Sequence, residues 1–353
     1  MRACHIARML VATIAVAAGL SQQPALASAY KKIRDWTVSC DMAMRCAMNY
    51  DNIDVRDFNS FSITRSSAPN APLELILPFP PAYRTTKDPN GRFVITVDGR
   101  EVFSRPITDM AEDRGNWRFS YSGNDLFSLA EAMKTGTGAR LSYTGDLGPL
   151  GLDIPLAGVT GSLLFIDEAQ GRLDRVDALQ AKGDKPAPER AAVTPVGYDD
   201  IPASIRGDFE SESDRCHVEE ERRSDFTGIE IRGEEGARLL LMPCNTPGAY
   251  NQPYAAYNGH DDDLLPTAFP MMTEEGPSTA LDAYNLDYDP TTRTISSFYK
   301  GRGIGDCGTL LEWTVDLTRW DGVLVLKQQR TKDDCDGQYV DPQEWPALWP
   351  VSR

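Results

Sequence analysis

Six cysteines that follow an export signal restrict the fold of this chain more than any other feature of its sequence. The first residues are basic, an apolar run spans Met9–Leu20, and small residues alternate from Ala25 to Ala29. This order is typical of a cleavable secretory signal peptide, so we predict that residues 1–29 are removed. The apolar run is shorter than the roughly 20 residues of a membrane-spanning helix. We therefore expect no membrane insertion after cleavage.

The cysteines that remain after cleavage indicate disulfide bonds. Cys4 leaves with the signal, and an even number stays in an exported chain, where an oxidising compartment favours disulfides. Zinc binding is less favoured because no Cys-x-x-Cys pair is present. Six cysteines allow fifteen pairings; separation into domains favours the first pair below, and sequence order favours the other two. The expected bridges are Cys40–Cys46, Cys216–Cys244 and Cys307–Cys335.

Length and charge limit the class of protein. Residues 30–353 are too many for one hydrophobic core, which predicts two domains. The formal net charge is −16, and the loss of Arg2 and Arg8 with the signal makes it −18. Such an acidic chain repels phosphate backbones and anionic lipid, so we expect no nucleic-acid partner. These features predict a soluble protein of the periplasm or the extracellular space.

Residues 180–195 divide the chain into two parts. This segment contains three prolines, alternating charges and no apolar period, which is typical of a linker. We predict one domain at 30–179 and a second at 196–353.

Both parts have the alternating pattern of β-strands, which predicts a mainly β fold with a β-sandwich-like first domain. Asp98-Gly99 lies between two apolar runs and is a strong signal for a tight hairpin. Short helices are expected at 126–135, with Asn124 or Asp125 as the cap and Gly136 as the end, and at 159–169. The expected strands are 35–40, 60–65, 73–77, 92–97, 101–104 and 139–143, then 236–242, 284–288, 294–299, 310–317 and 323–328, the last two joined by a turn at Trp320-Asp321-Gly322.

Catalytic motifs are scarce in this sequence. His217 and His260 are the histidines that remain after cleavage, and no Gly-x-Ser-x-Gly elbow occurs beside them. The glycine-rich segment Gly301–Gly308 has neither the dinucleotide nor the P-loop spacing. We expect its glycines to permit tight turns around Cys307. The sequence therefore predicts a protein that is not an enzyme and carries no cofactor.

Two acidic segments are weak candidates for a metal site. His260, Asp261 and Asp263 form a cluster that could attract a cation, although adjacent acids beside glycine are usually a solvated turn. The segment Asn285–Asp289 begins like a calcium-binding loop. Pro290 replaces the glycine that such a loop needs, and the closing glutamate is absent. We predict no metal site in either segment.

Tyr250, Tyr254 and Tyr257, together with neighbouring asparagines, form an aromatic and polar segment that we interpret as a loop. Such a loop could grip a sugar or a peptide. The alternative is an irregular loop that packs on the sheet.

Several motifs resemble known families. Asp35-Trp-Thr-Val-Ser-Cys-Asp41 with Cys46-Ala47, the Val97-Asp-Gly99 turn, the helix from Leu126 to Gly136 and Ile154-Pro-Leu-Ala-Gly158 resemble the invasion-associated locus B family. This chain is about twice as long as is usual in that family, so no virulence role is carried over.

The whole mature chain looks like a proteobacterial family of unknown function, domain of unknown function eleven-seventy-six. That resemblance rests on Gly301-Arg-Gly-Ile-Gly-Asp-Cys-Gly308, Trp320-Asp-Gly322 and the closing Cys335, Trp345 and Trp349. It implies an exported, β-rich, disulfide-bonded protein of a Gram-negative bacterium, and it implies no catalytic residue.

These observations favour a protein that acts by binding an envelope protein or a cell-wall component. Two alternatives stay open. One is an envelope hydrolase with an unrecognised carboxylate site, which a pocket with two facing acids would favour. The other is a calcium-binding protein outside the cytoplasm, which calcium would stabilise.

Overall fold

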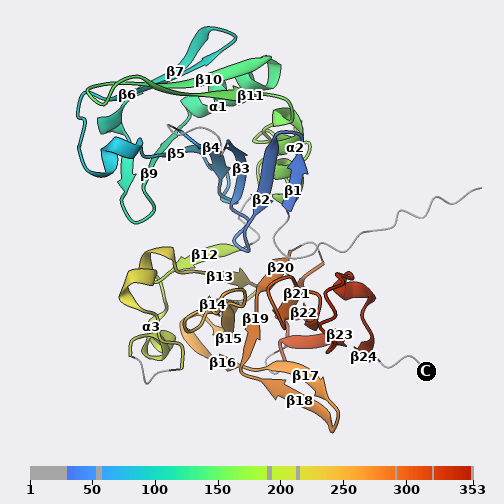
Figure 1. Ribbon diagram of the computed structural model, residues 1–353. Coiled ribbons are helices and arrows are strands. Elements are labelled where there is room, and N and C mark those ends of the chain that lie inside the picture. Colours follow the sequence, from blue (N-terminus) through green and yellow to red (C-terminus); the bar gives the residue numbers. More distant parts are fainter. Residues whose placement is uncertain are drawn as a thin grey trace, which may run out of the picture.

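The described residues form two lobes, one above the other in Figure 1. The upper lobe contains the elements from β1 to α2, and the lower lobe contains those from β12 to β24. The predicted signal peptide and two residues of the predicted turn, Trp320 and Asp321, lie outside the described residues. The computed structural model describes residues 30–52, 58–188, 193–211, 215–290, 292–319 and 322–350.

The upper lobe contains a seven-stranded antiparallel sheet. Buried and part-buried residues alternate along β2 and β5, so one face of each strand points into the core, as the period-two pattern predicts. The strand order is β1 (Tyr30–Ile33), β2 (Trp36–Cys40), β3 (Cys46–Asp51), β4 (Ser60–Arg65), β5 (Leu73–Pro78), β9 (Arg118–Gly123) and β8 (Ala111–Asp113).

A four-stranded sheet covers the other side of this lobe (Figure 1). Its β6–β7 hairpin turns at Asp98 and Gly99, whose φ angles of 48° and 79° are both in the left-handed region. A two-residue turn with this geometry matches the twist of the flanking strands, which confirms the predicted hairpin. The strand order is β11 (Leu150–Pro155), β10 (Gly138–Thr144), β6 (Arg92–Val97) and β7 (Arg100–Pro106).

Two helices pack within the upper lobe, as predicted. Helix α1 (Asp125–Thr135) contacts both sheets, and α2 (Val159–Ala169) covers β1, β2 and β3. Asn124 is the N-cap residue, as one of the two predicted alternatives had it, but it caps without a side-chain bond. Asp125 is held by Arg105 and Tyr121. The short 3-10 helices of this lobe are Pro81–Arg84 and Ile107–Asp109.

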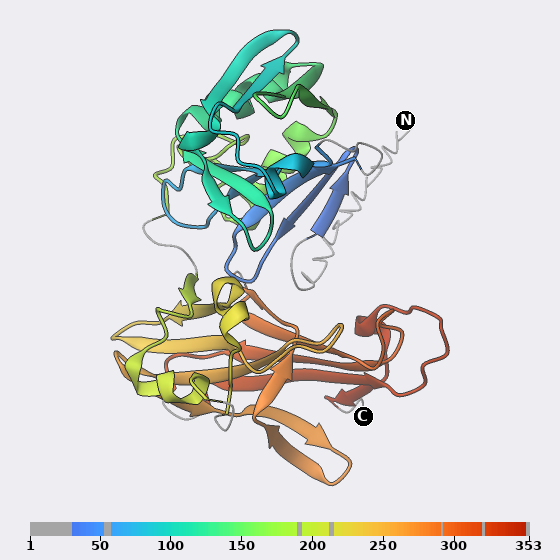
Figure 2. The ribbon, with the colours of Figure 1, turned by 60° about the vertical axis from the view of Figure 1, so that its left-hand side comes forward.

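The lower lobe is a pair of antiparallel sheets with a hydrophobic cluster between them. A small hairpin, β17 (Phe269–Thr273) with β18 (Gly276–Ala280), projects from the lobe in both views (Figure 2). One sheet contains β12 (Thr194–Gly197), β13 (Thr227–Arg232), β14 (Ala237–Pro243), β15 (Pro253–His260) and β16 (Asp263–Thr267), with β19 (Asp282–Tyr284) also paired to β15. The other contains β20 (Leu286–Asp289), β21 (Thr294–Lys300), β22 (Gly308–Val315), β23 (Leu324–Lys332) and β24 (Ala347–Trp349).

The first of these sheets is covered on both faces. Leu239 and Leu241 of β14 face the second sheet, whereas Leu240 and Met242 face a layer formed by residues 196–211 and 215–226. Burial on both faces explains why β14 is an unbroken apolar run rather than an alternating one. The layer contains the short helices α3 (Ala203–Arg206), Gly207–Phe209 and Glu220–Asp225, and Pro342–Glu344 is a further 3-10 helix near the chain end.

One predicted strand is wrong. Residues 284–288 do not form a single strand, because Asn285 adopts a left-handed φ of 48° and ends β19. The chain then enters β20 of the other sheet, so this segment joins the two sheets. The alternation of apolar and polar residues along one segment does not show that the chain passes from one sheet to another.

Three disulfides join the cysteines in the expected pairs, one favoured by separation into domains and two by sequence order. Cys40–Cys46 closes the β2–β3 hairpin within the upper lobe. Cys216–Cys244 ties the covering layer to the end of β14, and Cys307–Cys335 ties the start of β22 to the segment after β23.

The two lobes meet at the tip of the β2–β3 hairpin, residues 41–45, which we call the junction loop. Met42 and Ala43 are buried in the hydrophobic cluster of the lower lobe, beside Ile229 and Ile231. The blue tip reaches the lower lobe in both views (Figures 1 and 2). The upper lobe therefore supplies part of the lower core.

Polar contacts from the upper lobe fix the junction loop. The amide of Gln170 donates to the carbonyls of Met44 and Arg65 at 2.8 and 3.0 Å. The hydroxyl of Ser67 donates to the carbonyl of Ala43 at 3.1 Å. Two backbone carbonyls of the loop are thus held by side chains that lie far away in the sequence.

We predict that Met42→Ala lowers the free energy of unfolding by about 2 kcal/mol, because it leaves a cavity in the lower core. Met44→Ala is the matched control, since the Met44 side chain stays partly exposed and its loss should cost less. Urea unfolding of both variants measures the difference. Equal losses would show that Met42 is not a core residue of the lower lobe.

Candidate functional site

A cleft of about 650 Å³ lies beside the junction loop, with walls from both lobes. We call it the front cleft. Its walls are rich in proline and in hydroxyl groups, and its charged residues are Asp41, Arg45 and Glu74. This volume is within the range of small-molecule sites. Its lining residues are Asp41, Ala43, Arg45, Thr64, Ser66, Ser67, Ala68, Pro69, Pro72, Glu74, Ser122, Val193, Thr194, Pro195 and Thr227.

Arg45 connects the two carboxylates of the front cleft. Its guanidinium forms an ion pair with Glu74, and its backbone N–H donates to Asp41 at 2.9 Å. Thr64 donates its hydroxyl to the same Glu74 oxygen at 3.1 Å. Desolvation by the surrounding protein raises the pKa of Asp41, and the hydrogen bonds and charge of Arg45 oppose this rise.

Arg172 positions another wall of the front cleft. Its guanidinium donates to the carbonyls of Ser67 and Ala68 at 3.0 and 2.7 Å and forms an ion pair with Asp177. Burial and the nearby charge of Arg65 lower the pKa of Arg172 to about 10. The guanidinium therefore stays charged at neutral pH and holds the turn after β4. Sequence reasoning missed this role, because the carbonyls that Arg172 binds lie 105 and 104 residues away along the chain.

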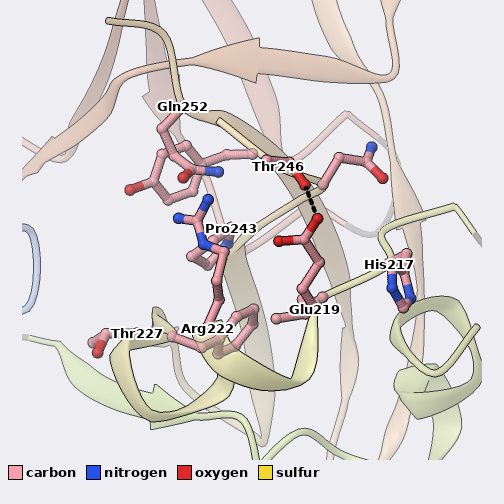
Figure 3. A pocket seen from close by; sticks show the side chains of 11 residues that line it. His217, Glu219, Arg222, Thr227, Pro243, Thr246 and Gln252 are labelled. Atoms are coloured by element: carbon pink, nitrogen blue, oxygen red, sulfur yellow. Dashed lines mark hydrogen bonds between the residues drawn. The ribbon is translucent and has the colours of Figure 1, made fainter. Parts of the chain in front are cut away.

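A smaller pocket of about 140 Å³ adjoins the front cleft at Thr227 (Figure 3). Glu219 accepts a hydrogen bond from Thr246 at 3.2 Å, and Arg222 extends toward Gln252 (Figure 3). Among the described residues, Arg222 has no carboxylate within 4 Å. This pocket has room for a few water molecules and is below the size of a typical ligand site.

The three predicted tyrosines do not form one surface. The predicted loop is wrong for Pro253–His260, which is strand β15. Tyr254 packs toward the cluster between the sheets and lines the small pocket, whereas Tyr257 is buried on the opposite face and donates to Asp208 at 2.9 Å. Positions three apart on a strand face opposite ways, so the two rings cannot grip one ligand.

Tyr250 lies at a separate place, in the loop before β15. Its hydroxyl approaches the carbonyl of Gly301 at 3.4 Å. Two asparagines fix this loop. Asn285 donates to the carbonyl of Tyr250 at 3.1 Å and to Asn251 at 2.9 Å, and Asn251 in turn bonds both backbone groups of Lys300. The residue that began the calcium-like motif is thus a structural bridge.

The acidic cluster at residues 260–263 is a hairpin turn. β15 ends at His260 and β16 begins at Asp263, with Asp261 in a left-handed conformation between them. Arg238 binds the Asp261 carbonyl and the Asp262 carboxylate. Across the part of the chain that the structure describes, no three His, Cys, Asp or Glu side chains gather closely enough to hold a metal ion.

The glycine-rich segment forms a tight loop between β21 and β22. A side chain at Gly308 would approach the carbonyl of Tyr299 to 2.0 Å, so only glycine fits there. Arg302 forms a two-bond ion pair with the buried carboxylate of Asp306, which also accepts the N–H of Gly337 at 2.6 Å. These contacts join the loop to the segment that Cys335 holds.

Comparison with known proteins identifies the family of this chain. The family model described as "Protein of unknown function (DUF1176)" matches residues 30–352. The chain belongs to this family. The DUF1176 chain is also similar to the "Uncharacterized protein YpfG" of Escherichia coli (strain K12), with 28% identity over 214 residues. The alignment covers 56% of this chain and 59% of that protein, so it spans less than two thirds of the relative.

No helix within the described ranges is long and apolar enough to cross a bilayer.

We predict that Asp306→Asn lowers the melting temperature at pH 7. Bonds from Arg302 and from the Gly337 N–H hold the pKa of Asp306 well below its usual range. An acid with a depressed pKa stabilises the fold above its unfolded pKa of about 4, and this contribution fades as the pH falls below that value. Thermal unfolding from pH 7 to pH 2 should show the two proteins converging. A constant difference would contradict the assignment.

Proposed function

We propose that this protein works outside the cytoplasm as a binding protein, and that its ligand occupies the front cleft. The observation that carries the proposal is a cleft of about 650 Å³ with walls from both lobes. The three disulfides and the export signal support a location in the periplasm. The resemblance of the first part to the invasion-associated locus B family agrees with that location.

The chemistry of the cleft favours a cell-wall fragment. Hydroxyls of Thr64, Ser66 and Ser122 offer hydrogen bonds, while proline rings supply flat apolar surface. Arg45 and Asp41 provide charges of both signs, which suits a fragment that carries sugars, amines and carboxylates. The fixed positions of the junction loop and of the wall held by Arg172 reduce the entropy lost on binding.

The test is a calorimetric titration with soluble peptidoglycan fragments. Ser66→Trp should raise the Kd at least about tenfold, because an indole at this exposed wall position fills the cleft. Ser128→Trp is the matched control, on an exposed face of α1 and outside the cleft wall. The proposal fails if the native protein binds no fragment, or if both variants bind equally.

A second candidate, an envelope hydrolase, is favoured by one observation. Asp41 and Glu74 both bind Arg45 in the same cleft, and desolvation raises the pKa of Asp41. An acid with a raised pKa retains its proton to higher pH than an ordinary aspartic acid and is suited to donate it.

For the hydrolase, we predict that the native protein cleaves the fragments and that Asp41→Asn abolishes this turnover. Mass spectrometry of the fragments recovered after titration distinguishes the two functions. Intact fragments after prolonged incubation would leave binding as the function, whereas cleavage by both proteins alike would exclude Asp41 as the acid.

A further inference from the structure

A second cleft, of about 640 Å³, also lies at the junction between the lobes. We call it the back cleft. It shares Ser67 and Thr194 with the front cleft, and Met44 of the junction loop forms part of its wall. Its upper wall comes from the end of α2 and the turn after it. Its lower wall comes from β12, β13 and the connection between β20 and β21.

Three arginines line the back cleft: Arg175 from the upper lobe, and Arg232 and Arg293 from the lower lobe. Two of them have no carboxylate partner among the described residues. The guanidinium of Arg175 donates to the carbonyls of Gly171 and Pro186 at 2.9 and 2.7 Å, and both acceptors are neutral. Within the part of the chain that the structure describes, Arg293 has no carboxylate oxygen within 4 Å.

Two acids also line this cleft. Glu230 is buried and already engaged by Arg232 at 2.9 Å and by Arg238. Glu168 stands in the upper wall. Asp316 lies near Arg293, but its carboxylate accepts the N–H and hydroxyl of Thr318. The lining side chains therefore carry more positive than negative charge, in a protein whose net charge is −16.

We infer that the back cleft binds a small molecule with at least two acidic groups, carboxylates or phosphates. Guanidinium groups are suited to such ligands because their paired N–H donors match two oxygens of one acidic group. Arg175 and Arg293 come from opposite lobes, so one ligand with two acidic groups would connect the lobes. A positively charged cleft also focuses the electric field of its arginines, which attracts anions into the cleft even though the protein as a whole is acidic. The back cleft shares two lining residues with the front cleft but has its own charged residues, and the inference does not depend on the function of the front cleft.

The experiment is a calorimetric titration of the full mature chain at low ionic strength, with two probes. Inorganic pyrophosphate represents phosphates, and citrate represents carboxylates. The native protein should bind one or both, and added salt should weaken the binding. Stronger binding of one probe identifies the acidic group that the cleft prefers.

Variants show whether binding occurs in the back cleft. Arg293→Gln and Arg175→Gln should each weaken binding about tenfold, as expected for the loss of one charged donor group. Arg293→Lys should retain part of the affinity because it keeps the charge. The control is Arg100→Gln, at an exposed hairpin of the upper lobe outside the cleft wall, which should bind like the native protein.

The outcome is decided even if one variant unfolds. Arg175 has structural hydrogen bonds, so Arg175→Gln is discarded if its circular dichroism spectrum shows unfolding. Arg293 forms no ion pair among the described residues, so Arg293→Gln decides alone. The inference is overturned if the native protein binds neither probe. It is equally overturned if folded Arg293→Gln binds both probes with native affinity, because the anions then bind elsewhere on the surface.

Discussion

The insertion of the junction loop into the lower core is the contact on which the rest of the molecule depends. A two-strand hairpin closed by Cys40–Cys46 presents Met42 and Ala43 to a cluster that the lower sheets leave open. Apolar burial drives this contact. The side chains of Gln170 and Ser67 bind the loop's carbonyls and keep its shape. Without the insertion, neither cleft between the lobes would have two walls.

A buried ion pair fixes one segment in each lobe. In the upper lobe, Arg172 and Asp177 pair in the interior and fix the turn that both clefts share. In the lower lobe, Arg302 and Asp306 pair beneath the glycine-rich loop. Breaking such a pair leaves an uncompensated buried charge, so each is a firm local constraint. The front cleft is lined by one more acid than base, whereas the back cleft is lined by one more base than acid.

Local patterns in the sequence predicted the helices, strands and turns well. They did not predict where these elements contact one another. Asp98-Gly99 specified its own turn, and Leu163 and Ile166 marked the buried side of α2, because both signals depend only on neighbouring residues. Tyr254 and Tyr257 lie on strand β15 and not in the predicted loop, so their positions three apart place them on opposite faces. The clefts could not be foreseen, since their walls join residues such as Glu74 and Thr227 that meet only through the lobe contact.

The shared core also constrains the order in which the chain acquires its structure. The β2–β3 hairpin is a local structure with its own disulfide, whereas the lower cluster gathers residues as distant in sequence as Ile229 and Leu324. Because local contacts form faster than non-local ones, we expect the hairpin to form before the lower sheets are complete. When those sheets form, Met42 and Ala43 are already available to cover Ile229 and Ile231. In this order, the upper lobe would supply part of the apolar surface on which the lower core assembles. A lower lobe produced on its own would expose an apolar patch and be prone to aggregate.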